Sequence, residues 1–145
     1  MKTTTCFFTG HRKLPPHKIE QITKRLNREI VNLISEGVTT FISGGAAGFD
    51  MIAASLVAAK KEMGANVHMI FALPSKKHDS LWNEKQRIFY MGLLAEADEI
   101  TYVSENYMAD SSAYCICALM CEDSRTAQVV RYAIEKGLQI INVIE

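Results

Sequence analysis

Three glycines and an acidic residue stand close together in the segment SGGAAGFD. Gly44 and Gly45 end an apolar run, and Gly48 and Asp50 come just before an alanine-rich helical pattern. A glycine-rich turn at a helix N-terminus exposes backbone N–H groups, and the helix dipole adds partial positive charge there, which suits a phosphate. The spacing matches neither G-x-G-x-x-G nor the P-loop, which ends in Gly-Lys-Ser/Thr. Two interpretations stay open: an anion site, or glycines that only allow a tight turn and close packing.

Asp50 limits what this loop can bind. In the first turn of a helix, a carboxylate stabilises the helix by about 0.3–1 kcal/mol through the dipole. The same carboxylate would repel a phosphate placed beside it. We therefore expect Asp50 either to cap the helix or to hydrogen-bond a neutral part of a ligand, such as a ribose hydroxyl. Ser43, which precedes the glycines, is a further candidate site residue.

A second polar segment, TGHRK, begins at Thr9 and Gly10 after the first apolar run. Arg12 could pair with a phosphate through two parallel hydrogen bonds, and Lys13 could add positive charge. His11 could donate a hydrogen bond in either protonation state. The ordinary alternative is a solvated basic turn. It is weakened here because the expected fold places this loop next to the glycine loop.

Apolar runs of strand length alternate along the chain with segments of helical pattern. Strands are predicted at residues 4–10, 38–43, 66–74, 99–104, 114–120 and 138–145. Helices are predicted at residues 17–36, 51–63, 81–97 and 125–136, with a helical turn within 105–112. Nearly continuous apolar strands that alternate with helices are typical of a parallel sheet covered on both faces. The predicted fold is a single α/β domain over residues 1–145, Rossmann-like and doubly wound, with a mostly parallel sheet of about six strands and helices on both faces.

In such sheets, ligands bind beyond the carboxyl ends of the strands, so the loops that lead into helices hold the candidates. The loop after the third strand contains Pro74 and Trp82, the only tryptophan. Trp82 could stack on a base or simply pack at the rim. Asp79 or Ser80 in the same loop is predicted to cap the next helix.

The composition disfavours several classes of protein. Lysine plus arginine and aspartate plus glutamate number 16 each, so the net charge is zero. This balance argues against binding to nucleic acid or an anionic membrane through bulk charge. The first apolar run is too short for a signal peptide, and no stretch approaches the ~20 apolar residues of a membrane span. We therefore expect a cytoplasmic protein that does not bind membranes.

The four cysteines are Cys6, Cys115, Cys117 and Cys121. The C-x-C-x3-C spacing of the last three is not a common zinc pattern. On a strand, Cys115 and Cys117 would share one face, and Cys121 would lie beyond the strand's end. We expect all four to be small buried hydrophobic residues, reduced and without a bound metal.

The chain resembles the YpsA-like family of the SLOG superfamily, which also contains DprA and the Lonely Guy cytokinin-activating hydrolases. The similar segments are TGHR, SGGAAGFD, ALPSKKHDSLWNEKQRIFYMGLLAEADEITYVS and TAQVVRYAIEKGLQIINV. They are spread from residue 9 to residue 143, so the resemblance extends over nearly the whole chain. The resemblance implies a Rossmann-like domain that binds a nucleotide or a nucleotide derivative. The site residues that it implies are Gly10, His11, Arg12, Gly44, Gly45, Gly48 and Asp50, joined by Asp110 and Thr126 in two further motifs.

This chain departs from the family pattern in two places. The segment before Asp110 is contracted, and Glu105 stands where the family has an arginine. The loop after the fifth strand reads CEDSRTA, which keeps Thr126 but lacks the family's two glycines. No carboxylate follows Thr126, whereas the Lonely Guy hydrolases carry a catalytic glutamate there. N-glycosidic hydrolysis by that mechanism is therefore not supported.

Four functions stay open. The leading one is binding or sensing of a nucleotide or phosphorylated nucleotide derivative, without strong catalysis and with no required cofactor. The second is a phosphoribohydrolase-like nucleotide hydrolase that uses Asp50, Asp98 or Asp110, for which the sequence offers no convergent pair. The third is binding of single-stranded DNA, which the zero net charge disfavours. The fourth is an interaction module with a vestigial pocket. The sequence also leaves a homo-oligomer open.

Overall fold

The computed structural model describes residues 2–75, 79, 82–104 and 106–144. The strands are β1 (Thr5–Gly10), β2 (Thr40–Ser43), β3 (His68–Leu73), β4 (Glu99–Tyr102), β5 (Tyr114–Ala118) and β6 (Gln139–Asn142). The α-helices are α1 (Ile19–Ser35), α2 (Phe49–Glu62), α3 (Glu84–Glu96), α4 (Tyr107–Asp110) and α5 (Arg125–Glu135). Two short 3-10 helices, η1 (Lys2–Thr4) and η2 (Pro16–Lys18), precede β1 and α1.

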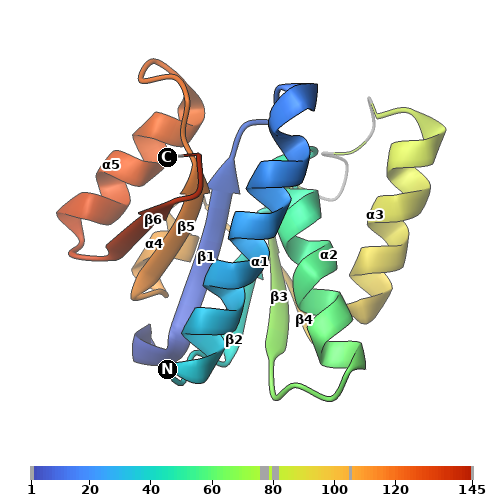
Figure 1. The fold of residues 1–145 in the computed structure, drawn as a ribbon, viewed down its shortest axis with the longest axis horizontal. Helices are drawn as coiled ribbons and strands as arrows, with labels where there is room; N and C mark the ends of the chain where they lie inside the picture. The colour runs from blue at the N-terminus through green and yellow to red at the C-terminus, as the bar shows by residue number, and fades with distance from the viewer. Residues whose placement is uncertain (1, 76–78, 80–81, 105, 145) are drawn as a thin grey trace.

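The six strands form one parallel sheet in the order β4-β3-β2-β1-β5-β6 (Figure 1). The chain adds β2, β3 and β4 on one side of β1 and then crosses over to add β5 and β6 on the other side. The direction of winding therefore reverses between β1 and β5, which pair from Cys6↔Tyr114 to Gly10↔Ala118. In open α/β sheets, the crevice at the carboxyl end of such a reversal is the usual place for a ligand.

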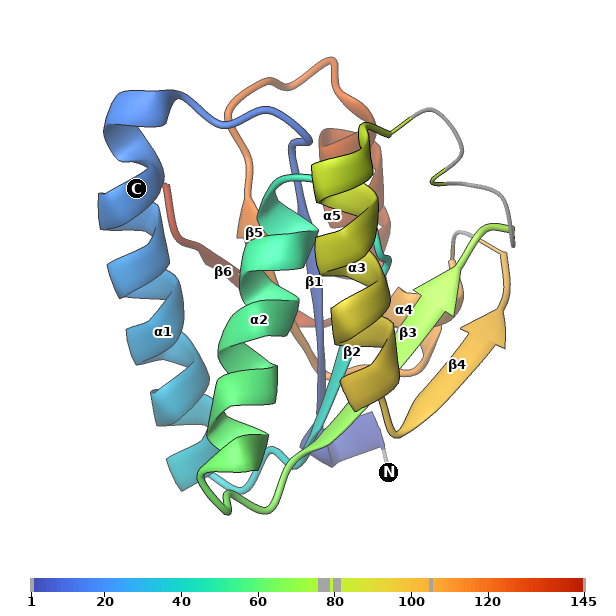
Figure 2. The ribbon, with the colours of Figure 1, turned by 90° about the vertical axis from the view of Figure 1, so that its right-hand side faces the viewer.

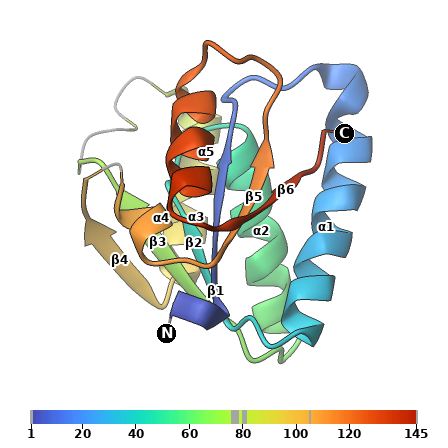
Figure 3. The same ribbon diagram turned by 90° about the vertical axis from the view of Figure 1, so that its left-hand side faces the viewer.

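Helices cover both faces of the sheet. Helices α1, α2 and α3 lie on one face (Figure 2), and α4 and α5 lie on the other (Figure 3). Successive residues of β1 point alternately to the two faces, with Cys6 and Phe8 in the cluster under α1–α3 and Phe7 in the cluster under α4 and α5. The predicted doubly wound α/β fold is confirmed, and all the strand pairs are parallel.

Helix α1 shows how the sequence sets one of these layers. Its buried residues are Ile22, Leu26, Ile30 and Leu33, spaced three or four apart, so they form one stripe against the sheet. Each such side chain contributes about 1.5–3 kcal/mol when fully buried. After the helix, Gly37 adopts a φ of 103°, a left-handed conformation that a side chain would disfavour.

The predicted N-cap of α3 was wrong. Asn83 caps this helix, because its side chain accepts a hydrogen bond from the Gln86 backbone N–H at 2.8 Å. The Gln86 side chain accepts in return from the Asn83 N–H at 3.2 Å, which completes a capping box. Of the two predicted caps, Asp79 is not used for this purpose, and Ser80 lies outside the described residues.

The last strand also ends earlier than predicted. Strand β6 ends at Asn142. The side-chain amide of Asn142 hydrogen-bonds to the backbone of Leu119, which follows the end of the neighbouring strand β5. Asn142 Oδ1 accepts from Leu119 N and from Ile144 N, both at 3.2 Å, and Nδ2 donates to Leu119 O at 3.3 Å. The side chain of Asn142 therefore supplies hydrogen bonds to these backbone groups that a longer pair of strands would supply with backbone groups.

The cysteines follow the prediction in part. Cys115 and Cys117 share the face covered by α4 and α5, as the strand pattern predicted. Cys6 is buried under α1–α3, and burial raises the pKa of its thiol far above the ordinary value. Cys121 is exposed, so the expectation that it is buried was wrong. Within the described ranges, no three or more His, Cys, Asp or Glu side chains are grouped so as to hold a metal ion. No helix in the same ranges is both long and apolar enough to cross a membrane.

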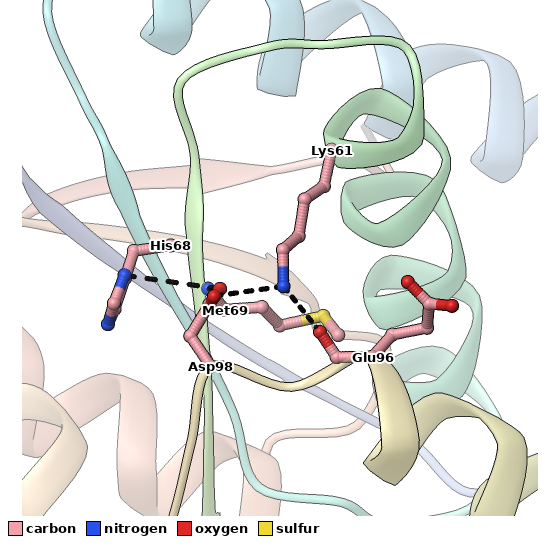
Figure 4. A network of polar contacts seen from close by, with 5 residues as sticks. All are labelled: Lys61, His68, Met69, Glu96 and Asp98. Carbon is pink, nitrogen blue, oxygen red and sulfur yellow. Dashed lines mark hydrogen bonds and ion pairs between the residues drawn. The ribbon is translucent and has the colours of Figure 1, made fainter.

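A polar network lies at the amino end of the sheet, beside the edge strand (Figure 4). Asp98 Oδ2 accepts a hydrogen bond from Met69 N at 2.8 Å, and Asp98 Oδ1 lies 2.9 Å from Lys61 Nζ. Lys61 Nζ also donates to the Glu96 carbonyl at 2.7 Å, and His68 Nδ1 lies 4.0 Å from Asp98 Oδ2. The hydrogen bond from Met69, with the bond and charge of Lys61, lowers the pKa of Asp98 despite its partial burial.

This network predicts an acid-labile contribution to stability. A carboxyl whose pKa is lowered on folding stabilises the protein above its unfolded-state pKa, and this effect is lost as the pH falls through the folded-state value. We expect Asp98→Asn to lower the unfolding free energy at pH 7 by about 1–2 kcal/mol, which is on the order of 2–8 °C in melting temperature. The deficit should shrink as the pH is lowered toward 3. Melting curves of wild type, Asp98→Asn and the exposed neighbour Glu99→Gln test this, and an equal loss in the Glu99 variant would contradict it.

Candidate functional site

A cleft of about 490 Å³ opens at the carboxyl edge of the sheet. The ends of β1 and β2, the residues around the ends of β3 and β4, helix α4 and the first turns of α5 all contribute to it. The lining residues are Thr9, Gly10, His11, Arg12, Gly44, Ala46, Asp50, Ala72, Pro74, Val103, Ser104, Met108, Ser124, Arg125, Thr126 and Val129. The cleft therefore lies at the reversal of strand order, where sheets of this type bind ligands.

A second open groove runs along α1 and has a volume of about 570 Å³. Its lining residues are His17, Glu20, Gln21, Lys24, Arg25 and Arg28. All of them belong to η2 and α1, so among the described residues no strand end and no other helix lines this groove. The cleft at the sheet edge is the stronger candidate because separate elements converge on it.

The loops after β1 and β2 touch each other, as predicted. Phe49 N at the start of α2 donates a hydrogen bond to the His11 carbonyl at 3.2 Å. Gly48 has a φ of 80°, and a Cβ placed on it would lie 2.2 Å from the Arg12 carbonyl oxygen. A Cβ on Gly10 would lie 2.5 Å from the ring of Phe49, which is fully buried. Gly10 and Gly48 are therefore required for close packing.

The side chain of Ser43 holds the glycine loop in place through two hydrogen bonds. Its side chain is buried, and its Oγ accepts a hydrogen bond from Gly45 N at 3.2 Å and donates to the Asp50 carbonyl at 3.4 Å. Gly45 has a φ of 72°, which favours glycine at this turn. Ser43, Gly45 and Gly48 thus support the loop, while Gly44 and Ala46 form the surface that faces the cleft.

Asp50 lies in the first turn of α2 and at the floor of the cleft. Its side chain is only 5% exposed. Oδ2 accepts a hydrogen bond from Ala46 N at 3.3 Å, whereas Oδ1 has no hydrogen-bond partner among the described residues. Burial raises the pKa of Asp50 to about 7, against the hydrogen bond from Ala46 and the positive charge of Arg12. At neutral pH this carboxyl is therefore protonated in a large fraction of molecules.

The opposite polar wall comes from the loop between β5 and α5. Ser124 caps α5, because its Oγ accepts from Ala127 N at 3.1 Å, and the buried Thr126 lines the cleft one turn away. Met120 N donates to His11 Nε2 at 3.0 Å, so this loop is tied to the loop after β1. Since His11 Nε2 is an acceptor, a neutral His11 carries its proton on Nδ1.

The third side of the cleft is an apolar wall, which the sequence analysis did not predict. It consists of Ala72 of β3, Val103 just after β4, Met108 of α4 and Val129 of α5. Met108 also approaches the glycine loop, since its Cε would lie 3.4 Å from a Cβ on Gly44. A usable signal existed for Val103 alone, because it lies near the carboxyl end of the strand predicted at residues 99–104. The other three look like ordinary core positions in the sequence. Ser104, Ser124, Arg125 and Ala46 were also not among the predicted site residues.

Not every predicted site residue lines the cleft. Thr9, Gly10, His11, Arg12, Gly44, Asp50, Pro74 and Thr126 do. Trp82 instead packs edge-on against Tyr90, with ring centroids 5.0 Å apart, which matches the rim-packing alternative. Asp110 is exposed and accepts a hydrogen bond from the Tyr132 hydroxyl at 2.6 Å. Glu105, at the contracted segment, lies outside the described residues.

The fold and the cleft define a class of protein. It is a doubly wound α/β domain with a ligand-sized cleft at the reversal of strand order, polar on two sides and apolar on the third. A model of the YspA SLOG family, YpsA, matches residues 7–132. This match covers most of the chain, which therefore belongs to that family, and the predicted resemblance is confirmed. Membership of this family suggests a nucleotide-related role and no specific activity.

Two curated proteins are similar to part of the chain. The uncharacterized SPbeta prophage-derived protein YoqJ of Bacillus subtilis (strain 168) is 34% identical over 56% of this chain and 50% of YoqJ. The UPF0398 protein BH1768 of Halalkalibacterium halodurans is 29% identical over 60% of this chain and 46% of that protein. The chain thus spans about half the length of the curated relatives it matches.

The contact at Gly48 can be tested with a matched pair of glycines. Gly48 and Gly37 both have positive φ, at 80° and 103°, but no atom of the described residues lies within 4 Å of a Cβ on Gly37. We expect Gly37→Ala to cost about 1–2 kcal/mol for the conformation alone. Gly48→Ala carries at least this conformational cost, because the ψ of −122° at Gly48 lies outside the left-handed region open to side chains. It adds a clash against Arg12 O and should lower the melting temperature clearly further. Equal losses in the two variants would contradict the close approach of the loops.

Asp50 should make the stability depend on pH. Its pKa rises on folding from 3.8 to about 7, so its contribution is fully present below about pH 3.8 and is lost as the pH rises through about 7. Asp50→Asn cannot ionise and should lack this loss. The melting temperature of the variant relative to wild type should therefore shift in the variant's favour from pH 4 to pH 8, without ligand. A difference that stays constant over this window would refute the raised pKa.

Proposed function

We propose that the cleft binds a nucleotide or a phosphorylated nucleotide derivative. The observation that carries the proposal is the convergence of three features on one cleft: the N-terminus of α2, the arginine Arg12 and an apolar wall. The helix N-terminus and Arg12 suit the phosphate of a nucleotide, and the apolar wall suits its base, with the sugar between them. The nucleotide-related role of the SLOG family points the same way.

The phosphate is assigned to the end formed by the glycine loop. The backbone N–H of Gly44, which lines the cleft, has no acceptor among the described residues. Its loop leads into α2, a helix of 14 residues whose dipole adds partial positive charge at this end. Arg12 adds a full charge on the rim. Repulsion from Asp50 is reduced because its raised pKa leaves much of this carboxyl neutral at pH 7.

The base is assigned to the apolar wall. Val103, Met108 and Val129 are only partly buried, so each has surface left to cover. A methionine side chain is flexible and polarizable, and it contacts flat rings favourably. A planar base against this wall would remove apolar surface from water and so stabilise the complex.

A thermal-shift screen against nucleotides tests the proposal. A ligand at a hundred times its dissociation constant stabilises a protein by about 2.7 kcal/mol, which here corresponds to a rise on the order of 5–11 °C. Arg12→Ala should weaken binding roughly ten- to a hundredfold, because it removes a charged partner of the phosphate. The control is Lys13→Ala, which removes an adjacent exposed cation that does not line the cleft. An equal effect of both variants, or no response of wild type to any nucleotide, would refute the assignment.

A second candidate function is a nucleotide hydrolase, and one observation favours it. A carboxyl with a pKa near 7 in a cleft is suited to general acid–base catalysis. Of the three carboxylates considered from the sequence, Asp50 lines the cleft, Asp98 lies at the other end of the sheet and Asp110 is bonded to Tyr132. Release of free base from nucleoside monophosphates by wild type, and its loss in Asp50→Asn, would establish this reaction. Binding without base release would leave the binding function alone.

A further inference from the structure

Asp50 lines the cleft, and one of its carboxyl oxygens is buried without a hydrogen-bond partner among the described residues. The side chain is 5% exposed, and Oδ2 is already engaged by Ala46 N at 3.3 Å. Oδ1 has no hydrogen-bond partner among the described residues. A buried carboxyl oxygen without a partner is costly, and it needs an explanation such as a ligand or an ordered water. A ligand that reaches Oδ1 must bring a hydrogen-bond donor.

The position of Asp50 tells which part of a nucleotide this donor belongs to. Asp50 Oδ2 bonds to Ala46, in the loop assigned to the phosphate, and lies 3.1 Å from where a Cβ on Gly44 would stand. Met108, in the apolar wall assigned to the base, approaches the same position, with its Cε 3.4 Å from it, so Asp50 lies next to both the glycine loop and the apolar wall. The group between phosphate and base in a nucleotide is the sugar, and its donors are hydroxyls.

We propose that Asp50 recognises the ribose hydroxyls of the ligand, so that the cleft selects ribonucleotides over nucleotides that lack these hydroxyls. This inference rests on the proposed nucleotide function. A small turn of the carboxyl brings Oδ1, which is buried in the free protein, to the cleft surface, where a ligand hydroxyl can donate to it. A ligand without this hydroxyl leaves the oxygen buried and unpaired. Sites built around such a hydrogen bond reject the analogue that lacks the donor.

Binding of matched nucleotide pairs tests the proposal. The probes are adenosine, guanosine, cytidine and uridine 5′-monophosphates and their 2′,3′-dideoxy analogues, measured by isothermal titration calorimetry on wild type. We expect each dideoxy analogue of a nucleotide that binds to bind roughly ten- to a hundredfold more weakly than its ribose form, from the loss of a hydrogen bond to a carboxyl. Equal affinities would overturn the proposal while the nucleotide function stands. Absence of binding by all eight probes would overturn both.

Variants separate recognition of the sugar from recognition of the phosphate. Asp50→Ala removes both carboxyl oxygens and should bring the ratio of dideoxy to ribose dissociation constants close to one. Asp50→Asn keeps an acceptor for Ala46 N, replaces the second oxygen with an amide NH2 and should give a smaller ratio than wild type. Arg12→Ala should weaken both members of each pair equally and leave the ratio unchanged. An unchanged ratio in both Asp50 variants would overturn the proposal, and the Asn variant decides if the Ala variant does not fold.

Discussion

The missing side chain of Gly48 sets the geometry of the cleft. Because no Cβ is present, the carbonyl of Arg12 approaches to within 2.2 Å of the position where one would stand. This contact, with the hydrogen bond from Phe49 N to the His11 carbonyl, holds the first loop against the start of α2. An arginine and a helix N-terminus are thereby placed beside one another. The packing and anion-binding interpretations of these glycines are compatible, since the close packing is what positions the groups that would hold an anion.

The burial of Asp50 works against the stability of the domain. A buried carboxyl with one unpaired oxygen is unfavourable, in a class of molecules whose folded states are stable by only about 5–15 kcal/mol. Neighbouring elements limit this cost, because Ala46 N bonds one oxygen and the charge of Arg12 favours the ionised form. Strain and unsatisfied groups of this kind concentrate at functional sites. Asp50 is therefore better understood through what it contacts in a complex than through its contribution to the free fold.

The sequence predicted the layers of the fold because periodicity is a local signal. The buried stripe of α1 and the alternating faces of β1 can both be counted directly in the residues. The glycine and basic loops were found because backbone turns need glycine and because the carboxyl ends of parallel strands meet at one edge. The apolar wall could not be found this way, since Ala72, Met108 and Val129 come together only through the tertiary arrangement. The cap of α3 was misplaced because several residues of the preceding loop have suitable side chains, and only the geometry selects Asn83.

The ion pair at the amino end of β4 also has a consequence for the cleft at the opposite end. Asp98 stands immediately before the edge strand, and its two oxygens engage Met69 N and Lys61 Nζ. If β4 slipped by one residue, about 3.3 Å, the carboxylate would leave both donors and the strand's side chains would exchange faces. Val103 and Ser104 follow β4 directly and line the cleft, so their placement depends on the register of this strand. The network at the amino end of the sheet thus fixes the register of β4, and with it the positions of the residues that follow this strand at the carboxyl end.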